Sequence, residues 1–337
     1  MESGSRGRES ERPRRRRGKS DRPVGGDSGA PLTLEGDDAQ QALADENRRT
    51  TPREQLRRDE AFDDISPEVG EIDEGALADL IEEDVDHAMS LLAEMTAATD
   101  PELAALARRL AGRLLIDLAR VGPSDSRGIG RIVSSPADRA DGDIDLDASL
   151  DALLSARAGS SIVAADDLRV RHWTKPTMAL SLLVDRSGSM SGDRLAVAAI
   201  AAAACSWRAP SDWSVLAFAD RQIALKSQDD ARTPPDVVGD LLRLRGQGTT
   251  DLQQALQSSS RQLERSRAKR RVTVLLSDCR ATAGVDPAQA AQRLDELCII
   301  APIDDAEDAE EFARKVGARF TTVSGASEIP HALAKVL

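Results

Sequence analysis

The sequence predicts an α/β protein with a doubly wound, mostly parallel sheet that is flanked by helices. Residues 178–184 and 272–276 form continuous apolar runs, which are typical of strands buried on both faces of a parallel sheet. Amphipathic helical stretches alternate with these runs through the C-terminal half, over residues 173–337. A small helical unit and a disordered N-terminal tail are expected to precede this domain.

The composition favours a globular protein that does not bind nucleic acid. The formal net charge is −13, whereas phosphate neutralisation requires a basic face, so a basic partner surface fits better. Three cysteines without CxxC spacing indicate a reducing compartment. Since the Arg-rich N-terminus lacks the apolar core of a secretory signal and no run reaches ~18 apolar residues, we expect a cytoplasmic protein without a membrane span.

Residues 1–66 are charged, rich in Gly and Pro, and expected to be disordered. The basic run at residues 14–17 could contact nucleic acid or an acidic protein, but a solvated tail is the favoured interpretation. Residues 67–125 form the helical segment, in which two amphipathic helices are predicted on either side of Asp100 and Pro101. This segment carries no chemical motif, so we interpret it as a docking or bundle element.

Residues 126–172 are predicted to be a linker with an edge strand and a short helix. Alternate aspartates from Asp141 onwards suggest a calcium loop, but Leu146 and Ala152 occupy the positions where an EF-hand needs Gly and Glu. The alternation instead favours an edge strand, with Asp147 capping a helix that begins at Ala148.

The remaining elements follow from the same alternation of apolar runs and helical periodicity. Further strands are predicted at residues 213–218, 298–301 and 320–323, with a short antiparallel edge strand at 222–225. Helices are predicted at residues 194–207, 235–244, 251–265, 287–296, 306–316 and 328–336.

Two aspartates follow the buried strands of this sheet. Asp185 comes directly after the first apolar run, and Asp278 follows the second after one serine. Unpaired carboxylates are costly at such positions unless a cation or donor compensates them. Ser187 and Ser189 alternate with Asp185 in a loop where Gly188 permits a tight reversal, and these hard oxygen donors suit Mg²⁺ rather than zinc.

This Asp-x-Ser-x-Ser loop resembles the metal-ion-dependent adhesion site (MIDAS) of von Willebrand factor A (VWA) domains and integrin inserted domains. Family members add a Thr from a Gly-rich loop, matched by Thr250, and an Asp at the end of the fourth strand, matched by Asp278. The resemblance covers about residues 168–337 and implies a Rossmann-like VWA domain. It also implies one bound Mg²⁺ or Mn²⁺ with the ligands Asp185, Ser187, Ser189, Thr250 and Asp278.

Two residues depart from the family's usual pattern. Thr249 stands where Gly is more common, so it can substitute for Thr250 as the ligand. Cys279 stands where Gly often follows the Asp, and its soft thiol is a poor Mg²⁺ ligand that we expect to be inert.

Residues 167–171 and 277–281 resemble the bacterial cytoplasmic branch of the superfamily, which includes the integrin-like domain of the magnesium chelatase D protein and VWA proteins that work with MoxR-type AAA+ ATPases. The chelatase protein carries an AAA+ module, whereas this chain has no GxxxxGK[ST] loop. The resemblance therefore implies a partner of a MoxR-type ATPase in the assembly or maturation of a client complex. A magnesium-chelatase-like role in metal insertion is the alternative.

The expected ligand set favours binding over catalysis. Three neutral hydroxyls leave the ion positively charged, so an acidic side chain of the ATPase or its client can complete the coordination. Neither His172 nor His331 lies near the ligands in the sequence, and no third carboxylate is apparent as a base, so hydrolysis is not expected. A further alternative is that the metal only stabilises the fold and the helical segment binds the partner.

Overall fold

The computed structural model of the chain describes residues 33–46, 50–120, 131–137, 143–159, 167–174, 178–186, 192–246, 248–280 and 284–337. The basic run at residues 14–17 lies outside these ranges. Within them, no helix is both long and apolar enough to cross a membrane.

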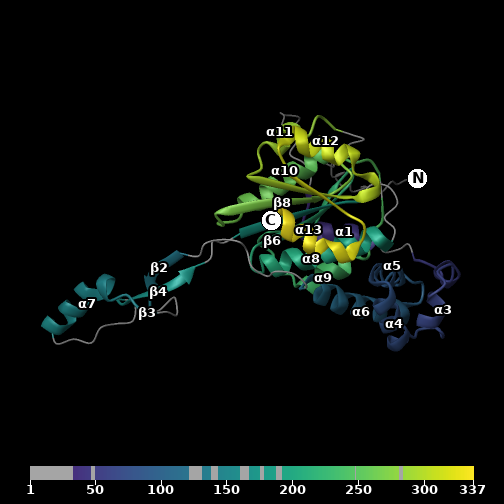
Figure 1. The fold of residues 1–337 in the computed structure, drawn as a ribbon, viewed down its shortest axis with the longest axis horizontal. Coiled ribbons are helices and arrows are strands. Elements are labelled where there is room, and N and C mark those ends of the chain that lie inside the picture. The colour runs from purple at the N-terminus through teal and green to yellow at the C-terminus, as the bar shows by residue number, and fades with distance from the viewer. Residues whose placement is uncertain are drawn as a thin grey trace, which may run out of the picture. The chain divides into compact units, whose positions relative to one another are not determined.

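A seven-stranded sheet in the order β1-β7-β6-β5-β8-β9-β10 forms the centre of the fold (Figure 1). Every neighbouring pair is parallel except β6 and β7. The antiparallel strand β7 was expected at the edge, but β1 pairs along its outer side. The strands are β1 (Thr33–Leu34), β5 (Met178–Asp185), β6 (Trp213–Phe218), β7 (Gln222–Lys226), β8 (Arg270–Leu276), β9 (Glu296–Pro302) and β10 (Arg319–Val323).

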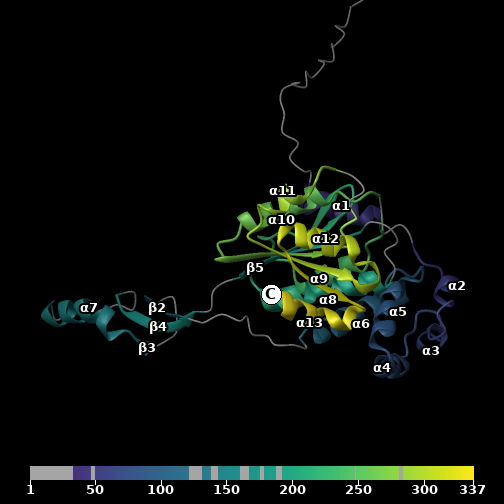
Figure 2. The same ribbon diagram turned by 45° about the horizontal axis from the view of Figure 1, so that its top comes forward.

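Helices cover both faces of this sheet. Successive side chains of a strand point to opposite faces, so its apolar strands present an apolar surface on each side. In β5, Leu182 and Val184 pack into one apolar core and Leu183 into the other. Figures 1 and 2 show the two helical layers on opposite sides of the sheet. One layer holds α8 (Gly192–Arg208), α9 (Pro234–Leu241) and α13 (Ile329–Val336), and the other holds α10 (Leu252–Glu264), α11 (Ala288–Ala291) and α12 (Glu307–Val316). The doubly wound α/β prediction is confirmed.

The helical segment forms three helices rather than two: α4 (Glu74–Glu83), α5 (Val85–Met95) and α6 (Pro101–Ala119). Asp84 produces the additional break, since its carboxylate accepts hydrogen bonds from the backbone N–H groups of Asp86 and His87 and so starts a new helix. The break at Asp100 and Pro101 is as predicted, with Asp100 capping α6.

These helices share their apolar core with the α/β domain instead of forming a separate unit. Leu92 of α5 and Leu115 of α6 lie in the same buried cluster as Ile200 of α8. Gly192, at the start of α8, lies so close to α5 that a Cβ atom there would be 2.5 Å from the Ser90 carbonyl oxygen. This shared core was not predicted, because an apolar helical face does not reveal what it packs against.

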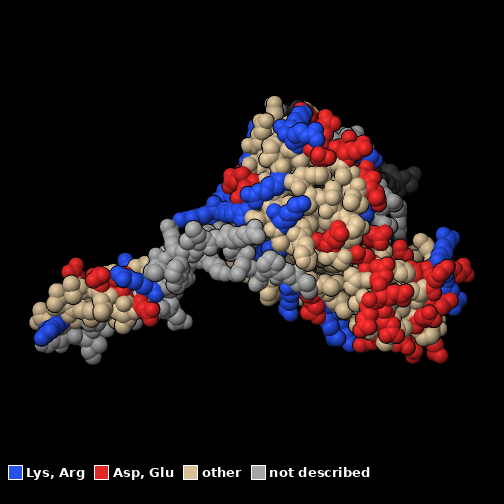
Figure 3. Space-filling view, in the orientation of Figure 1, with Lys and Arg blue, Asp and Glu red and all other residues tan. Residues whose placement is uncertain are grey.

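The prediction of disorder up to residue 66 is wrong for the described residues from Thr33 onwards. This stretch contains α1 (Gly36–Glu46), α2 (Arg53–Leu56) and α3 (Phe62–Ile65). This stretch is polar on average, but its side chains Leu56, Phe62 and Ile65 are each at most 1% exposed and anchor it to the core. Figure 3 shows that acidic side chains cover the surface of the neighbouring helices α3 and α4.

A separate three-stranded antiparallel sheet has the order β2-β4-β3, from β2 (Arg131–Pro136), β3 (Asp143–Ile144) and β4 (Arg169–Thr174), with α7 (Leu146–Gly159) beside β4. The edge strand at Asp143–Ile144 is as predicted. The helix begins earlier than expected, and Asp145 caps it rather than Asp147, accepting a hydrogen bond from the Ala148 N–H at 3.1 Å. The hydrogen bond from Arg171 lowers the pKa of Asp145.

We predict that Phe62→Ala lowers the free energy of unfolding by about 3–5 kcal/mol, because it removes a fully buried aromatic side chain and leaves a cavity. Guanidinium titration of the whole chain measures the change. Val69→Ala is the matched control, since Val69 is 72% exposed and its truncation should cost less than about 0.5 kcal/mol. Equal stability of Phe62→Ala and the wild type would contradict the assignment of this stretch to the core.

Candidate metal centre

Asp185 and Asp278 lie at the same edge of the sheet, at the ends of neighbouring parallel strands. Asp185 is the last residue of β5, where Val184 pairs with Leu276 of β8. The chain proceeds from β5 to β6 on one side and resumes with β8 on the other, so this is the point where strand order reverses. Ligand sites of open α/β sheets lie at such points. The structure therefore brings together the two carboxylates that the sequence singled out.

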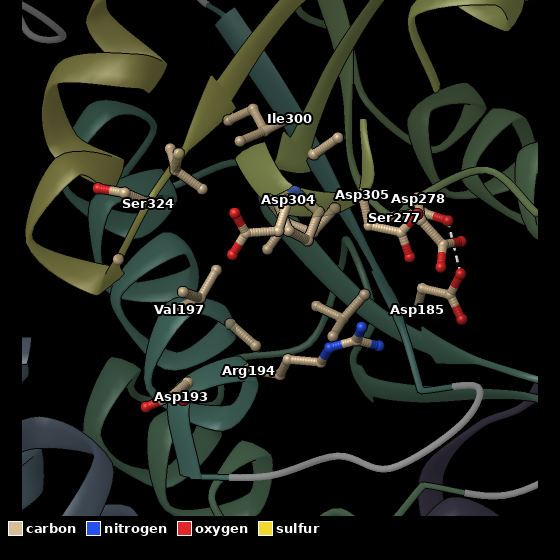
Figure 4. Close-up of a pocket in the computed structure, with 17 residues that line it drawn as sticks. Asp185, Asp193, Arg194, Val197, Ser277, Asp278, Ile300, Asp304, Asp305 and Ser324 are labelled. Atoms are coloured by element: carbon tan, nitrogen blue, oxygen red, sulfur yellow. Dashed lines mark hydrogen bonds between the residues drawn. The ribbon is translucent and has the colours of Figure 1, made fainter. Parts of the chain in front are cut away.

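Ser277 links the two strand ends. Its hydroxyl donates a hydrogen bond of 2.5 Å to Oδ2 of Asp185 and accepts one of 2.8 Å from the Cys279 N–H (Figure 4). The Arg280 N–H donates to Oδ1 of Asp278 at 3.0 Å. Ser277 thus orients the Asp185 carboxylate, a role that the sequence analysis missed because it treated this serine only as a spacer.

Cys279 adopts a backbone conformation that usually requires glycine. Its φ of 60° is positive, which is true of no other non-glycine residue in the described ranges. Its thiol is buried, and burial raises the thiol pKa to about 12, with the charges of Asp185 and Asp278 adding to the effect. The thiol is therefore protonated at neutral pH, in line with the expectation that Cys279 is inert.

Thr250 lies beside the third strand end of this edge. The loop that carries it is anchored by the Asp251 N–H, which donates to the Ala219 carbonyl at 3.1 Å. Ala219 directly follows β6, whose Phe218 pairs with Asp185. Thr250 is 1% exposed, whereas Thr249 is exposed, so burial favours Thr250 as the inward-facing hydroxyl.

Asp251 holds the end of this loop in place. Its side chain caps α10 by accepting a hydrogen bond from the Gln254 N–H at 3.0 Å. Gly284 has a φ of +92° and lies so close that a Cβ atom there would be 2.8 Å from Oδ1 of Asp251. The cap therefore depends on a glycine in the segment that follows β8.

Ser187 and Ser189 lie outside the described residues, so their predicted role as ligands stays a prediction. In the described part of the chain, no group of three or more His, Cys, Asp or Glu side chains is placed to hold a metal ion. A metal centre at this edge would therefore depend on hydroxyl ligands in addition to Asp185 and Asp278. The oxygen-only donor set fits a hard divalent cation.

A pocket of about 280 Å³ opens beside the two carboxylates. Asp304 and Asp305, which follow β9, line it together with Arg194 of α8, whose guanidinium extends toward Asp185 (Figure 4). Arg280 forms an ion pair of 2.5 Å with Asp305. These two carboxylates were not expected at the site, because Pro302 and Ile303 separate them from the apolar run that ends at Ala301.

Comparisons with solved structures report likenesses at low sequence identity over about half of this chain. The von Willebrand factor type A protein from Catenulispora acidiphila is 14% identical, with a TM-score of 0.39 over 49% of this chain and 43% of that chain. The manganese-loaded TRAP protein from Plasmodium vivax is 15% identical, with a TM-score of 0.38 over 47% of this chain and 72% of that chain. No curated protein shows a significant sequence match.

The family comparison covers more of the sequence. Residues 125–301, more than half of the chain, match the family described as VWA domain containing CoxE-like protein. Together with the doubly wound sheet, this match shows that the chain belongs to the CoxE-like family of VWA-domain proteins.

We predict that Ser277→Ala lowers the free energy of unfolding by about 1–3 kcal/mol, because it removes a short hydrogen bond to the Asp185 carboxylate. Denaturant titration in EDTA measures this without any contribution from a metal. Ser260→Ala is the control, since the Ser260 hydroxyl is exposed and its 3.4 Å bond to Glu264 contributes little. Equal effects of the two substitutions would show that Ser277 does not hold Asp185.

Proposed function

We propose that the VWA domain binds one divalent cation, Mg²⁺ or Mn²⁺, and uses it to bind an acidic side chain of a MoxR-type AAA+ ATPase or of its client. The protein would then act as an adaptor in the assembly or maturation of a client complex, not as an enzyme. The observation that carries the proposal is the juxtaposition of Asp185 and Asp278 at the switch point of the sheet. The proposed ligands are Asp185, Ser187, Ser189, Thr250 and Asp278.

The arrangement of the described ligands supports a cation site. Two carboxylates with like charge lie at neighbouring strand ends, and a cation would relieve their repulsion. Ser277 already holds one oxygen of Asp185, which fixes the orientation of the carboxylate before any ion binds. The bound ion would supply a partly neutralised positive charge, because the three remaining ligands are neutral hydroxyls.

Arg194 supports an acidic partner. It is the one basic side chain among the described residues that line the pocket, and its guanidinium extends toward Asp185. Arg donors match a carboxylate in a two-bond geometry, so Arg194 can contact the same partner side chain that reaches the metal. The acidic side chains around Arg194 would disfavour an anion at the pocket without a metal, which makes binding dependent on the cation.

We choose an ATPase as the partner for two reasons. The sequence resembles VWA proteins that work with such ATPases, and it lacks a nucleotide-binding motif. The run Gly18-Lys19-Ser20 resembles the end of a GxxxxGK[ST] motif, but Pro13 stands where the motif needs its first Gly. We therefore assign the ATP-driven step to a second protein. A magnesium-chelatase-like role in metal insertion would use the same surface with a different client.

Hydrolysis is the alternative that the pocket itself suggests, since Asp304 and Asp305 add carboxylates near the proposed ion. However, Arg280 pairs with Asp305, and no His is among the described residues that line the pocket. A general base must be within reach of the water that it activates. Turnover of phosphate esters or ATP by the purified, metal-loaded protein, lost in Asp304→Asn, would favour this alternative over the adaptor.

We predict that Mg²⁺ or Mn²⁺ raises the melting temperature of the whole chain, because a ligand that binds only the native state stabilises it by mass action. At a hundredfold excess over Kd the gain is about 2.7 kcal/mol. Asp185→Ala should abolish the shift, whereas Asp193→Asn, which changes another carboxylate of the same pocket, should preserve it. Equal Mg²⁺ affinity of wild type and Asp185→Ala in calorimetry would refute the metal site.

We predict that the complex with the MoxR-type ATPase or its client weakens when EDTA removes the ion. Ser187→Ala, Asp278→Ala and Arg194→Ala should each weaken it as well. A carboxylate on a partly desolvated cation contributes several times the roughly 0–1 kcal/mol of an exposed ion pair. Loss of Asp278 should therefore cost more than loss of Arg194.

Pull-downs with variants of verified fold test whether loss of Asp278 weakens the complex more than loss of Arg194. Undiminished binding in EDTA and in Asp278→Ala would transfer the interaction to the helical segment. A metal-dependent melting temperature combined with metal-independent partner binding would identify the ion as purely structural.

A further inference from the structure

A second cavity, of about 230 Å³, shares no lining residue with the proposed metal centre among the described residues. Thr50, Thr96 and Arg108 line it from the helical segment and the residues before it, and Arg243 and Arg245 line it from the stretch that follows α9. Three arginines thus converge on one small cavity in a chain with a formal net charge of −13. A cavity lined by charges of one sign focuses their field and attracts ions of the opposite sign.

Arg108 has no anionic partner in the described part of the chain. Its Nη1 donates to the Thr96 carbonyl at 3.1 Å, which is a neutral acceptor. Burial lowers the pKa of Arg108, and the positive charge of Arg243 lowers it further. A partly buried cation usually has an anion beside it, so the surroundings of Arg108 favour an anionic ligand.

No carboxylate is among the described residues that line the cavity, and the Asp240 carboxylate beside it is shared with a second arginine. Asp240 lies 3.5 Å from Arg243, but its second oxygen is bonded to Arg232 at 2.6 Å. The positive charge of Arg245 lowers the pKa of Glu94 on α5, but burial of Glu94 has the larger effect and raises this pKa. Within the described ranges, only Asp240 is an anionic partner of Arg108 or Arg243, and Arg232 shares it. These two arginines therefore bring an excess of positive charge to the cavity.

We propose that this cavity binds a phosphate group. Arginine forks match the oxygens of phosphate, and two such forks on one cavity suit a tetrahedral anion. The Thr50 hydroxyl accepts a hydrogen bond from Thr99 at 3.0 Å, which leaves its own hydrogen to donate to a ligand oxygen. The cavity is smaller than the roughly 300–1,000 Å³ of pockets for organic ligands, so it fits one phosphate group rather than a whole nucleotide.

A bound phosphate would join two parts of the chain that already touch here. The Thr96 hydroxyl donates to the Leu242 carbonyl at 3.2 Å, across the same junction. The anion would add bonds from Arg108 of α6 on one side and from Arg243 on the other. Its binding should therefore stabilise the packing of α6 against the end of α9.

Calorimetry with inorganic phosphate tests the proposal, using the whole chain in EDTA and chloride of matched ionic strength as the reference titration. We expect saturable binding and a higher melting temperature in phosphate than in chloride. Arg243→Gln, a partly exposed position that should not disturb folding, is expected to weaken binding roughly tenfold or more. Arg108→Ala should do the same, with Arg108→Lys retaining part of the affinity if the truncation fails to fold.

Arg109→Ala is the matched control, because Arg109 is the exposed neighbour of Arg108 on α6 and should leave phosphate binding unchanged. An ADP titration separates two sources of the group. Tighter binding of ADP than of phosphate would indicate the terminal phosphate of a nucleotide whose remainder lies outside the cavity, and equal or weaker binding would indicate free phosphate. Absence of saturable phosphate binding, or binding that Arg243→Gln and Arg108→Lys both leave unchanged, would overturn the proposal.

Discussion

The parallel pairing of β5 with β8 is the constraint on which the candidate centre depends. Because both strands run in the same direction and Val184 pairs with Leu276, the residues that follow them emerge at one edge. Two carboxylates that are far apart in the sequence then lie side by side, and Ser277 bridges the strand ends. A register shift of one residue would turn every core side chain of β5 to the opposite face, so the packing of both helical layers enforces this alignment.

The candidate metal centre and the arginine-lined cavity differ in the sign of the charge that they gather. At the sheet edge, carboxylates gather beside hydroxyls, and a hard cation is the complementary ligand. At the junction of α6 with the end of α9, arginines gather instead, and a hydrated oxyanion is complementary. The first site lies where loops follow the strand ends, and the second lies between α6 and the stretch that follows α9.

Most of the α/β domain could be predicted from periodicity, because its central strands bury both faces and therefore show as apolar runs. The positions of Asp185 and Asp278 after buried strands could be predicted from the apolar runs, whereas Thr250 was expected only from the family resemblance. The structure brings all three to neighbouring strand ends. The roles of Ser277 and Asp305 could not be predicted, since they depend on contacts with residues elsewhere in the sequence, Asp185 and Arg280. Averages over residues 1–66 concealed single buried side chains such as Phe62, because a few anchors order a polar stretch without changing its mean composition.

The shared core of α5, α6 and α8 has a thermodynamic consequence for how the chain opens. Leu92 and Ile200 belong to one buried cluster, so separating the helical segment from the sheet would expose both sides of that cluster to water. The slowest-exchanging backbone amides of the two regions should therefore report the same global opening, instead of two independent ones. Any ligand of the native state, whether at the sheet edge or at the arginine cavity, would then slow hydrogen exchange in helices that it never touches.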